Sequence, residues 1–398
     1  MILLTLTPLH IGDGEELSPF DYIIETVSAP SSRKLLKVYP LDYLLNKLSE
    51  KYTAEALHSR LSLLKSWVQS PEALKRFSLK EYFREANIAF EPKYQLEIKN
   101  QNSSIEGKRI KTFVKNLEGF YIPGSEIKGA LRTVFIYGIL KNNPTWKNEI
   151  YKKLEITLRN LKNSNLNKKK QTEEIEKFFH KEIESLIFRP KGTKDAQFDL
   201  FKSLLISDSE PISYDKFYVD FVKVLNTSRE ISEPHELLKP NQKISLRVFL
   251  DEKIALEGLK KVGLLEQGFY NPNLEKVTWS FLKESAIDFY LSLINHEKTF
   301  LSRKDLPNKE KLLENLNHLE NLINRVKNES KIIIPLRIGK HQGYLSTTLM
   351  LLLKQEKEDL FNEIFKISAP IHRNELNKTR KITLSDYNFL GWCMLVVK

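Results

Sequence analysis

The sequence predicts an α+β protein, because short apolar runs typical of strands alternate with longer stretches in which apolar residues recur every three or four positions. In two places, near residues 120 and 335, an apolar run leads through a glycine-containing turn into a patterned helix. With 398 residues the chain is long enough for two or three domains, each with its own core. We therefore expect two strand-turn-helix units to organise the fold.

The first unit covers residues 119–132. Ser125 is expected to cap the helix, since a serine hydroxyl accepts a hydrogen bond from a free amide of the first turn. Lys128 and Arg132 lie four residues apart and share one helix face, and Gly129 removes a side chain from the first turn. One interpretation is a turn that binds phosphate at the positive end of the helix dipole. The other is a solvated face, and the pattern alone leaves both open.

The N-terminal strand ends in a segment, residues 9–17, that two glycines interrupt. Gly12 and Gly14 permit backbone conformations closed to other residues, so amides of this loop are candidates to face a ligand, with His10 and Asp13 beside them. A dinucleotide-binding fingerprint is excluded because its third glycine is missing. A plain turn, with a structural histidine at the strand end, remains the alternative.

Strands and helical insertions alternate over the first 255 residues. Runs rich in β-branched and aromatic residues predict strands at 2–7, 22–27, 37–39, 94–99, 217–224 and 244–250, the last two separated by a proline-bearing loop at 232–240. Helical periodicity predicts insertions at about 41–90 and 141–187, with Lys168 to Lys170 in a hydrophilic linker of the second. A ferredoxin-like or RRM-like core, a split βαβ with a sheet open to RNA, can be assembled from these pieces.

The second strand-turn-helix unit covers residues 332–353 and follows two amphipathic helices, at 274–295 and 308–328. Its turn is rich in glycine and basic side chains, so an anion is again a candidate ligand. The residues are Arg337, Gly339, Lys340, His341 and Gly343. A closing hairpin, 381–384 with 390–397, is expected to complete the sheet. The repetition predicts tandem domains, 1–255 and 256–398, although any protein that mixes strands and helices contains such units.

The charge balance is basic, because 63 Lys and Arg residues against 51 Asp and Glu give a net charge of +12. This suits an extended polyanion, although basic proteins without such a partner are common. The single cysteine, Cys393, lies in an apolar run and is expected to be buried, so neither a disulfide nor a cysteine-based zinc site is predicted. A basic leader and an apolar span of about 18 residues are both missing, which predicts a cytoplasmic protein without membrane contact.

Three short motifs carry a resemblance to a known family. They are Ile122-Pro123-Gly124-Ser125 followed by Ile127-Lys128-Gly129-Ala130-Leu131-Arg132, His10-Ile11-Gly12 with Gly14, and Arg337-Ile338-Gly339-Lys340 with Gln342-Gly343-Tyr344. The chain resembles the RAMP superfamily, the RNA-binding subunits of CRISPR effector complexes, and within it one subunit of the type III-A Csm complex. Each motif is weak alone, but together they reach both ends and the middle of the chain.

The resemblance implies a non-catalytic, crRNA-binding subunit that caps the backbone filament at the crRNA 3′ end and supports crRNA maturation in antiviral defence. It implies tandem ferredoxin-like domains and, as partners, complementary target RNA and other Csm subunits, especially the repeated backbone RAMP subunit and the small helical subunit. No catalytic residue, metal or cofactor is expected. The expected RNA-binding residues are His10, Gly12, Asp13, Gly14, Ser125, Lys128, Gly129, Arg132, Arg337, Gly339, Lys340, His341 and Gly343.

Two other functions are left open. Some RAMP relatives cleave RNA without a metal ion, with histidine as general acid or base, and His10, Asp13 and His341 would be the candidates here. Against this, the chain has no histidine-rich motif and no metal-ligand spacing such as His-Glu-x-x-His. A basic scaffold that binds other proteins is the third hypothesis.

Overall fold

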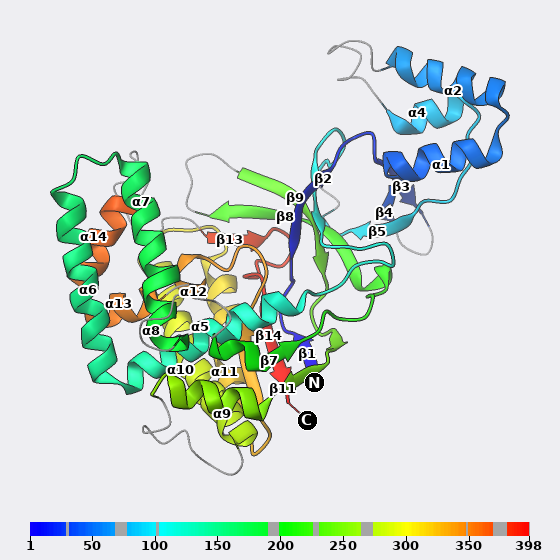
Figure 1. Ribbon diagram of the computed structural model, residues 1–398. Coiled ribbons are helices and arrows are strands. Elements are labelled where there is room, and N and C mark those ends of the chain that lie inside the picture. The colour runs from blue at the N-terminus through cyan, green and yellow to red at the C-terminus, as the bar shows by residue number, and fades with distance from the viewer. Residues whose placement is uncertain are drawn as a thin grey trace.

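The structure is a computed structural model that describes residues 1–28, 32–67, 78–100, 103–189, 199–225, 231–263, 274–347, 349–368 and 380–397. The fold is α+β, as the sequence predicts, and its named strands form a four-stranded sheet, a larger sheet and a two-stranded sheet. Helices cover the four-stranded sheet and form two further groups at the edges of the molecule (Figure 1).

The four-stranded sheet is antiparallel and joins both ends of the chain. Its order is β10 (Lys243–Ser245), β1 (Ile2–Thr5), β14 (Trp392–Val396) and β12 (Ile333–Arg337). Ile2 pairs with Val396, so the two termini lie side by side. The long helix α10 (Leu274–Ser302) contacts β12, α5 (Gly124–Asn142) and α11 (Lys309–Lys327). An antiparallel sheet with helices packed on it is compatible with a ferredoxin-like core.

The larger sheet has eight strands and contains β2, which carries one of the two glycine turns of the site described below. Its order is β2 (Gly12–Leu17), β6 (Ile110–Phe113), β9 (Ile231–Leu238), β8 (Phe217–Leu225), β5 (Tyr94–Ile98), β4 (Arg33–Val38) and β3 (Tyr22–Val27), with β13 (Arg380–Thr383) also paired to β8. The β6–β9 and β5–β8 pairs are parallel. The two-stranded sheet pairs β7 (Leu204–Ile206) with β11 (Val248–Leu250).

Two predicted loops turn out to be strands. Residues 12–17 of the expected glycine loop form β2, whose register against β6 shifts between Gly12 and Glu16, so the intervening residues bulge outward. The expected loop at 232–240 forms β9, although Pro234 has no N–H to donate. Pro234 is tolerated because its partner Phe221 bonds elsewhere: the Phe221 amide donates to Asp220 Oδ1, and the Phe221 carbonyl accepts from Leu384 N, each at 2.8 Å.

The predicted closing hairpin is also wrong. The strand at Arg380–Thr383 pairs with β8 in the larger sheet, whereas Trp392–Val396 lies between β1 and β12 in the four-stranded sheet. The chain therefore crosses between the sheets within residues 384–391. The expected boundary near residue 255 does not separate the sheets either, since each of the two main sheets takes strands from both sides of it.

The first helical insertion contains α1 (Leu41–Lys51), α2 (Ala54–Trp67) and α4 (Leu79–Glu85), and part of the predicted span, 68–77, lies outside the described residues. These helices bury a small core of their own around Leu48 and Tyr82. They project beyond β3, β4 and β5 (Figure 1). The insertion is thus attached to the edge of the larger sheet.

The second insertion contains α6 (Pro144–Lys162), α7 (Lys168–Lys177), a π-helical turn (Phe178–Ile183) and α8 (Glu184–Phe188). The three lysines expected in a linker instead begin α7, where the Asn167 side chain accepts from Lys170 N. This insertion packs against α14 (Glu358–Ser368), which follows α12 (Tyr344–Thr347) and α13 (Met350–Glu356). The remaining helix, α9 (Glu252–Lys261), packs on the short 3₁₀ turn Leu200–Ser203.

Two further sequence expectations concern burial. Cys393 on β14 is fully buried, as expected, and burial raises the pKa of its thiol. Within the described ranges, none of the helices is both long enough and apolar enough to cross a bilayer.

Candidate nucleic-acid interface

The structure brings the two predicted glycine turns together, although they are more than 300 residues apart in the sequence. The Lys340 amide donates to the His10 carbonyl at 2.7 Å. Gly339 has a φ of 79°, and a Cβ at this position would lie 2.4 Å from the His10 carbonyl oxygen. Glycine is therefore required where the two turns touch.

The first turn of α5 joins the same place, because the Gly339 amide donates to Glu126 Oε2 at 3.1 Å. All three motifs that suggested a phosphate-binding surface thus meet at one junction. The junction lies where β1, β2, β12 and α5 end or begin, so rigid elements hold each turn.

The bulge of β2 is an open part of the junction. Gly12, Asp13 and Gly14 are exposed, and no atom lies within 4 Å of a Cβ built on Gly14. The Asp13 carboxylate is fixed, since it accepts from Thr112 Oγ1 at 2.6 Å and from Glu15 N at 2.9 Å. This carboxylate orders the bulge from the side, in the manner of an Asx turn.

Three histidines gather beneath the junction: His10, His341 and His235, which comes from β9. The His10 and His235 ring centroids are 4.7 Å apart, those of His10 and His341 are 6.0 Å apart, and the His235 and His341 Nε2 atoms are 3.1 Å apart. His235 Nδ1 lies 2.9 Å from the Glu233 carbonyl, so this nitrogen donates and the His235 Nε2 accepts from His341. No group of metal-ligating side chains in the described ranges is arranged to hold a metal ion.

Burial keeps these imidazoles neutral. Desolvation lowers the pKa of His10 from 6.5 to about 4, that of His341 to about 3 and that of His235 to about 2. The positive charge of Lys340 contributes to the lowered pKa of His10 and His341. At neutral pH the positive charge of the junction therefore comes from lysines and not from histidines.

The lysines around the histidines are Lys111, Lys340 and Lys381, each of which lowers the pKa of at least one of them by its charge. Lys340 is exposed, whereas Lys111 is paired with Glu16. Burial lowers the pKa of Lys381, which is partly covered and has no carboxylate within salt-bridge distance among the described residues. Lys340 and Lys381 are consequently the cations best placed to meet an incoming anion.

The predicted cap of α5 is wrong. The helix begins at Gly124, Ser125 lies within its first turn without a capping bond, and the Gly124 amide donates instead to Asp208 Oδ1 at 2.8 Å. The start of α5 packs closely against the end of β7, since a Cβ on Gly124 would lie 2.2 Å from the Ile206 carbonyl oxygen. This close packing lets a distant segment cap the helix. Ser125 and Gly129 are exposed, and nothing lies within 4 Å of a Cβ on Gly129.

Lys128 and Arg132 face the protein. Lys128 Nζ donates to the Leu204 carbonyl at 2.6 Å. The Arg132 guanidinium forms a two-pronged pair with Asp199, at 3.0 and 2.8 Å, and lies over the Phe188 ring at 3.9 Å. Arg337 is buried under its turn, with 3% of its surface exposed. Lys128 and Arg132 are thus bound within the protein, whereas the sequence predicts that they share a phosphate-facing side. RNA contact by Lys128, Arg132 and Arg337 remains a prediction.

Sequence reasoning missed His235 and Glu236. Glu236 is fully buried, burial raises the pKa of its carboxyl group, and the group accepts from Tyr94 Oη at 2.7 Å and from Phe113 N at 2.8 Å. Both residues lie in the segment 232–240, which is predicted to be a loop because it contains proline. The only local signal was the histidine itself, since the contact with His10 joins residues more than 200 positions apart.

The fold and the converging turns define a class of protein. The RAMP superfamily model matches residues 2–340, and the chain belongs to this family. Among curated proteins it is similar to the CRISPR system protein Csm5 of Streptococcus thermophilus, with 25% identity over 284 residues that cover 67% of this chain and 68% of that protein. It is also similar to Csm5 of Methanocaldococcus jannaschii, with 25% identity over 363 residues that cover 89% and 73%.

Two solved structures share the fold. A chain in the cryo-EM structure of a Csm–crRNA–target RNA ternary complex of a type III-A CRISPR-Cas system aligns with a TM-score of 0.65 and 21% identity, over 100% of this chain and 99% of that one. The crystal structure of T. onnurineus Csm5 aligns with a TM-score of 0.64 and 21% identity, over 99% and 100%. At these identities the likeness extends to the fold alone.

Proposed function

We propose that this protein is the crRNA-binding Csm5-type subunit of a type III-A Csm complex, where it caps the backbone filament at the crRNA 3′ end and supports crRNA maturation. The observation that carries the proposal is the junction of the β2 bulge and the turn after β12, which places the exposed residues of the bulge beside the exposed side chain of Lys340. An exposed lysine binds phosphates without regard to base sequence. Membership in the RAMP superfamily and similarity to Csm5 support the assignment.

The proposed partners follow from the same assignment. They are crRNA, complementary target RNA, the repeated backbone RAMP subunit and the small helical subunit. The relative orientation of the RNA can be tested in the assembled complex with 4-thiouridine placed at either end of the crRNA. The 3′-terminal nucleotide is expected to cross-link to this chain and the 5′-terminal nucleotide to another subunit; the reverse result would contradict the capping role.

RNA binding at the junction is tested with Lys340→Gln. Loss of one phosphate contact is expected to reduce the slope of log K against log salt by about 0.7 on single-stranded RNA, equally for unrelated sequences. Lys327→Gln is the matched control, because Lys327 is an exposed lysine at the end of α11, which precedes the opposite end of β12. Equal slopes for wild type and Lys340→Gln would remove Lys340 from the RNA contacts.

The histidine cluster is the feature that the endoribonuclease alternative would use. The lowered pKa values of its three histidines nevertheless support a non-catalytic role. Metal-independent cleavage needs a general base and a protonated general acid. His10, His235 and His341 are all neutral at pH 7, and His10 is fully buried. Incubation of labelled RNA with the purified chain is expected to give no turnover. Cleavage that is lost in His341→Ala would establish the alternative.

A further inference from the structure

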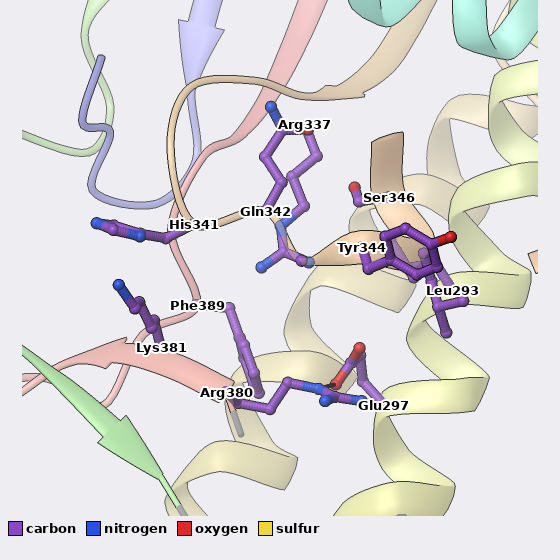
Figure 2. A pocket seen from close by; sticks show the side chains of 12 residues that line it. Leu293, Glu297, Arg337, His341, Gln342, Tyr344, Ser346, Arg380, Lys381 and Phe389 are labelled. Carbon is purple, nitrogen blue, oxygen red and sulfur yellow. Dashed lines mark hydrogen bonds and ion pairs between the residues drawn. The ribbon is translucent and has the colours of Figure 1, made fainter. Parts of the chain in front are cut away.

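A cavity lies beside the turn that follows β12. Its volume is about 220 Å³, and its walls come from α10, the end of β12, the turn, α12 and β13. Figure 2 shows side chains from these elements around it, with Arg337 and Arg380 on different sides. The cavity is smaller than the roughly 300–1,000 Å³ typical of sites for drug-sized ligands, so it fits a small group.

The cavity carries an excess of positive charge. Arg337, Arg380 and Lys381 line it, and Glu297 is the carboxylate that faces them. Glu297 pairs with Arg380. Lys381 has no carboxylate partner in the described part of the chain, and His341, also in the wall, is neutral at pH 7 because burial lowers its pKa to about 3. The charges of Glu297 and Glu233 act on Arg337 and Lys381 without a salt bridge, so three cations in the wall face the single carboxylate of Glu297.

Arg337 is the more unusual of these cations. It is 3% exposed, and its Nε donates to the Leu390 carbonyl at 3.0 Å. The guanidinium lies 5.2 Å from the Trp392 ring centroid, and no carboxylate in the described ranges approaches within 4 Å. A buried charge without a salt bridge is costly. Burial lowers the pKa of Arg337 to about 10, and the charge of Glu297 opposes this only in part. An anion in the cavity would compensate this charge.

Ser346 provides a second, independent observation. It is 3% exposed, it lines the cavity, and its Oγ has no hydrogen-bond partner in the described part of the chain. A buried hydroxyl without a hydrogen-bond partner is destabilising. Such a donor, in the same cavity wall as Arg337, fits an acceptor-rich anion.

We infer that this cavity binds a phosphate group through Arg337 and the Ser346 hydroxyl, with Lys381 as a further cation in the wall. A phosphate has several acceptor oxygens for a guanidinium fork, an ammonium and a hydroxyl, and its charge matches the excess in the cavity. The phosphate belongs either to an RNA strand that crosses the adjacent turn or to a free nucleotide. The assignment to RNA rests on the function proposed above, whereas the site itself does not.

The experiment uses the full chain in a phosphate-free buffer, with inorganic phosphate and adenosine 5′-monophosphate as probes and isothermal titration as the readout. Ser346→Ala and Lys381→Gln are each expected to weaken binding of both probes about tenfold, the effect of one hydrogen bond of about 1.4 kcal/mol. Lys327→Gln is the matched control and should bind as wild type does. Ser346→Ala removes a hydroxyl without a partner, so its fold is expected to be at least as stable as wild type. Thermal unfolding without ligand checks this.

A short single-stranded RNA titrated into the same variants separates the sources. Parallel weakening of RNA binding assigns the phosphate to RNA, and unchanged RNA binding assigns it to a free nucleotide. If the wild-type chain binds phosphate but no RNA, the phosphate site is supported and the proposed RNA-binding function is contradicted. The inference is overturned if wild type shows no saturable binding of either probe, or if both variants bind the probes as tightly as wild type.

Discussion

Acidification is expected to destabilise the protein through the histidine cluster beneath the junction. His10, His235 and His341 stay neutral in the folded chain, with pKa values of about 4, 2 and 3, whereas each has an ordinary value near 6.5 when unfolded. Between these limits the unfolded chain binds more protons than the folded one. The stability contributed by the three neutral imidazoles is therefore complete above pH 7 and is lost as the pH falls through 6.5 toward 4.

The magnitude follows from the difference in pKa. At pH 5 an unfolded histidine with a pKa of 6.5 is protonated, and if its folded counterpart is not, folding loses about 2 kcal/mol for that residue. Three such residues give an upper limit of roughly 6 kcal/mol, a large fraction of the 5–15 kcal/mol that stabilises most domains. Burial raises the pKa of Glu236 and Asp220, which opposes this loss as their carboxyls take up protons. A comparison with a variant isolates the histidine contribution.

The assay is urea denaturation of wild type and His235→Gln between pH 5 and pH 7.5. Removal of one histidine that titrates only when unfolded is expected to reduce the slope of unfolding free energy against pH by about 1 kcal/mol per pH unit near pH 5.5. His58→Gln is the matched control, since His58 is exposed on α2. Equal slopes for wild type and His235→Gln would refute the reasoning, because His235 would then titrate alike in both states.

Two further predictions concern the structural roles of residues in α5. Arg132→Met is expected to lower the unfolding free energy by about 2–3 kcal/mol, because Asp199 loses its two-pronged partner in a partly buried site. Unchanged stability in urea would contradict this structural role. Gly124→Ala should destabilise by about 3 kcal/mol or more, because its Cβ would lie 2.2 Å from the Ile206 carbonyl oxygen. Gly129→Ala should leave the unfolding free energy unchanged or raise it by up to about 1 kcal/mol, because the space around its Cβ is open. Equal thermal stability of the two glycine variants would contradict the packing described for the start of α5.

The sequence by itself determined the elements whose signals are local. Helical periodicity predicts α5, α10 and α11, because the face that a helix buries sets its spacing of apolar residues. Runs rich in β-branched and aromatic residues predict β3, β5 and β8. The glycines at 12, 14, 339 and 343 were singled out for the same kind of reason, since Gly14, Gly339 and Gly343 have positive φ values that other residues rarely adopt.

The tertiary structure alone decided what these elements contact. Nothing near Arg132 in the sequence indicates Asp199, and nothing near His10 indicates His235, because each contact depends on how segments far apart in the chain are packed. The same holds for β9, where Pro234 breaks the local strand pattern but lies opposite a residue whose hydrogen bonds are made elsewhere. A local sequence pattern depends on the conformational propensity of a segment and on the face that it buries. The residues that a side chain contacts depend on the free energy of the whole fold. The direction in which a cation points is therefore a property of the tertiary structure.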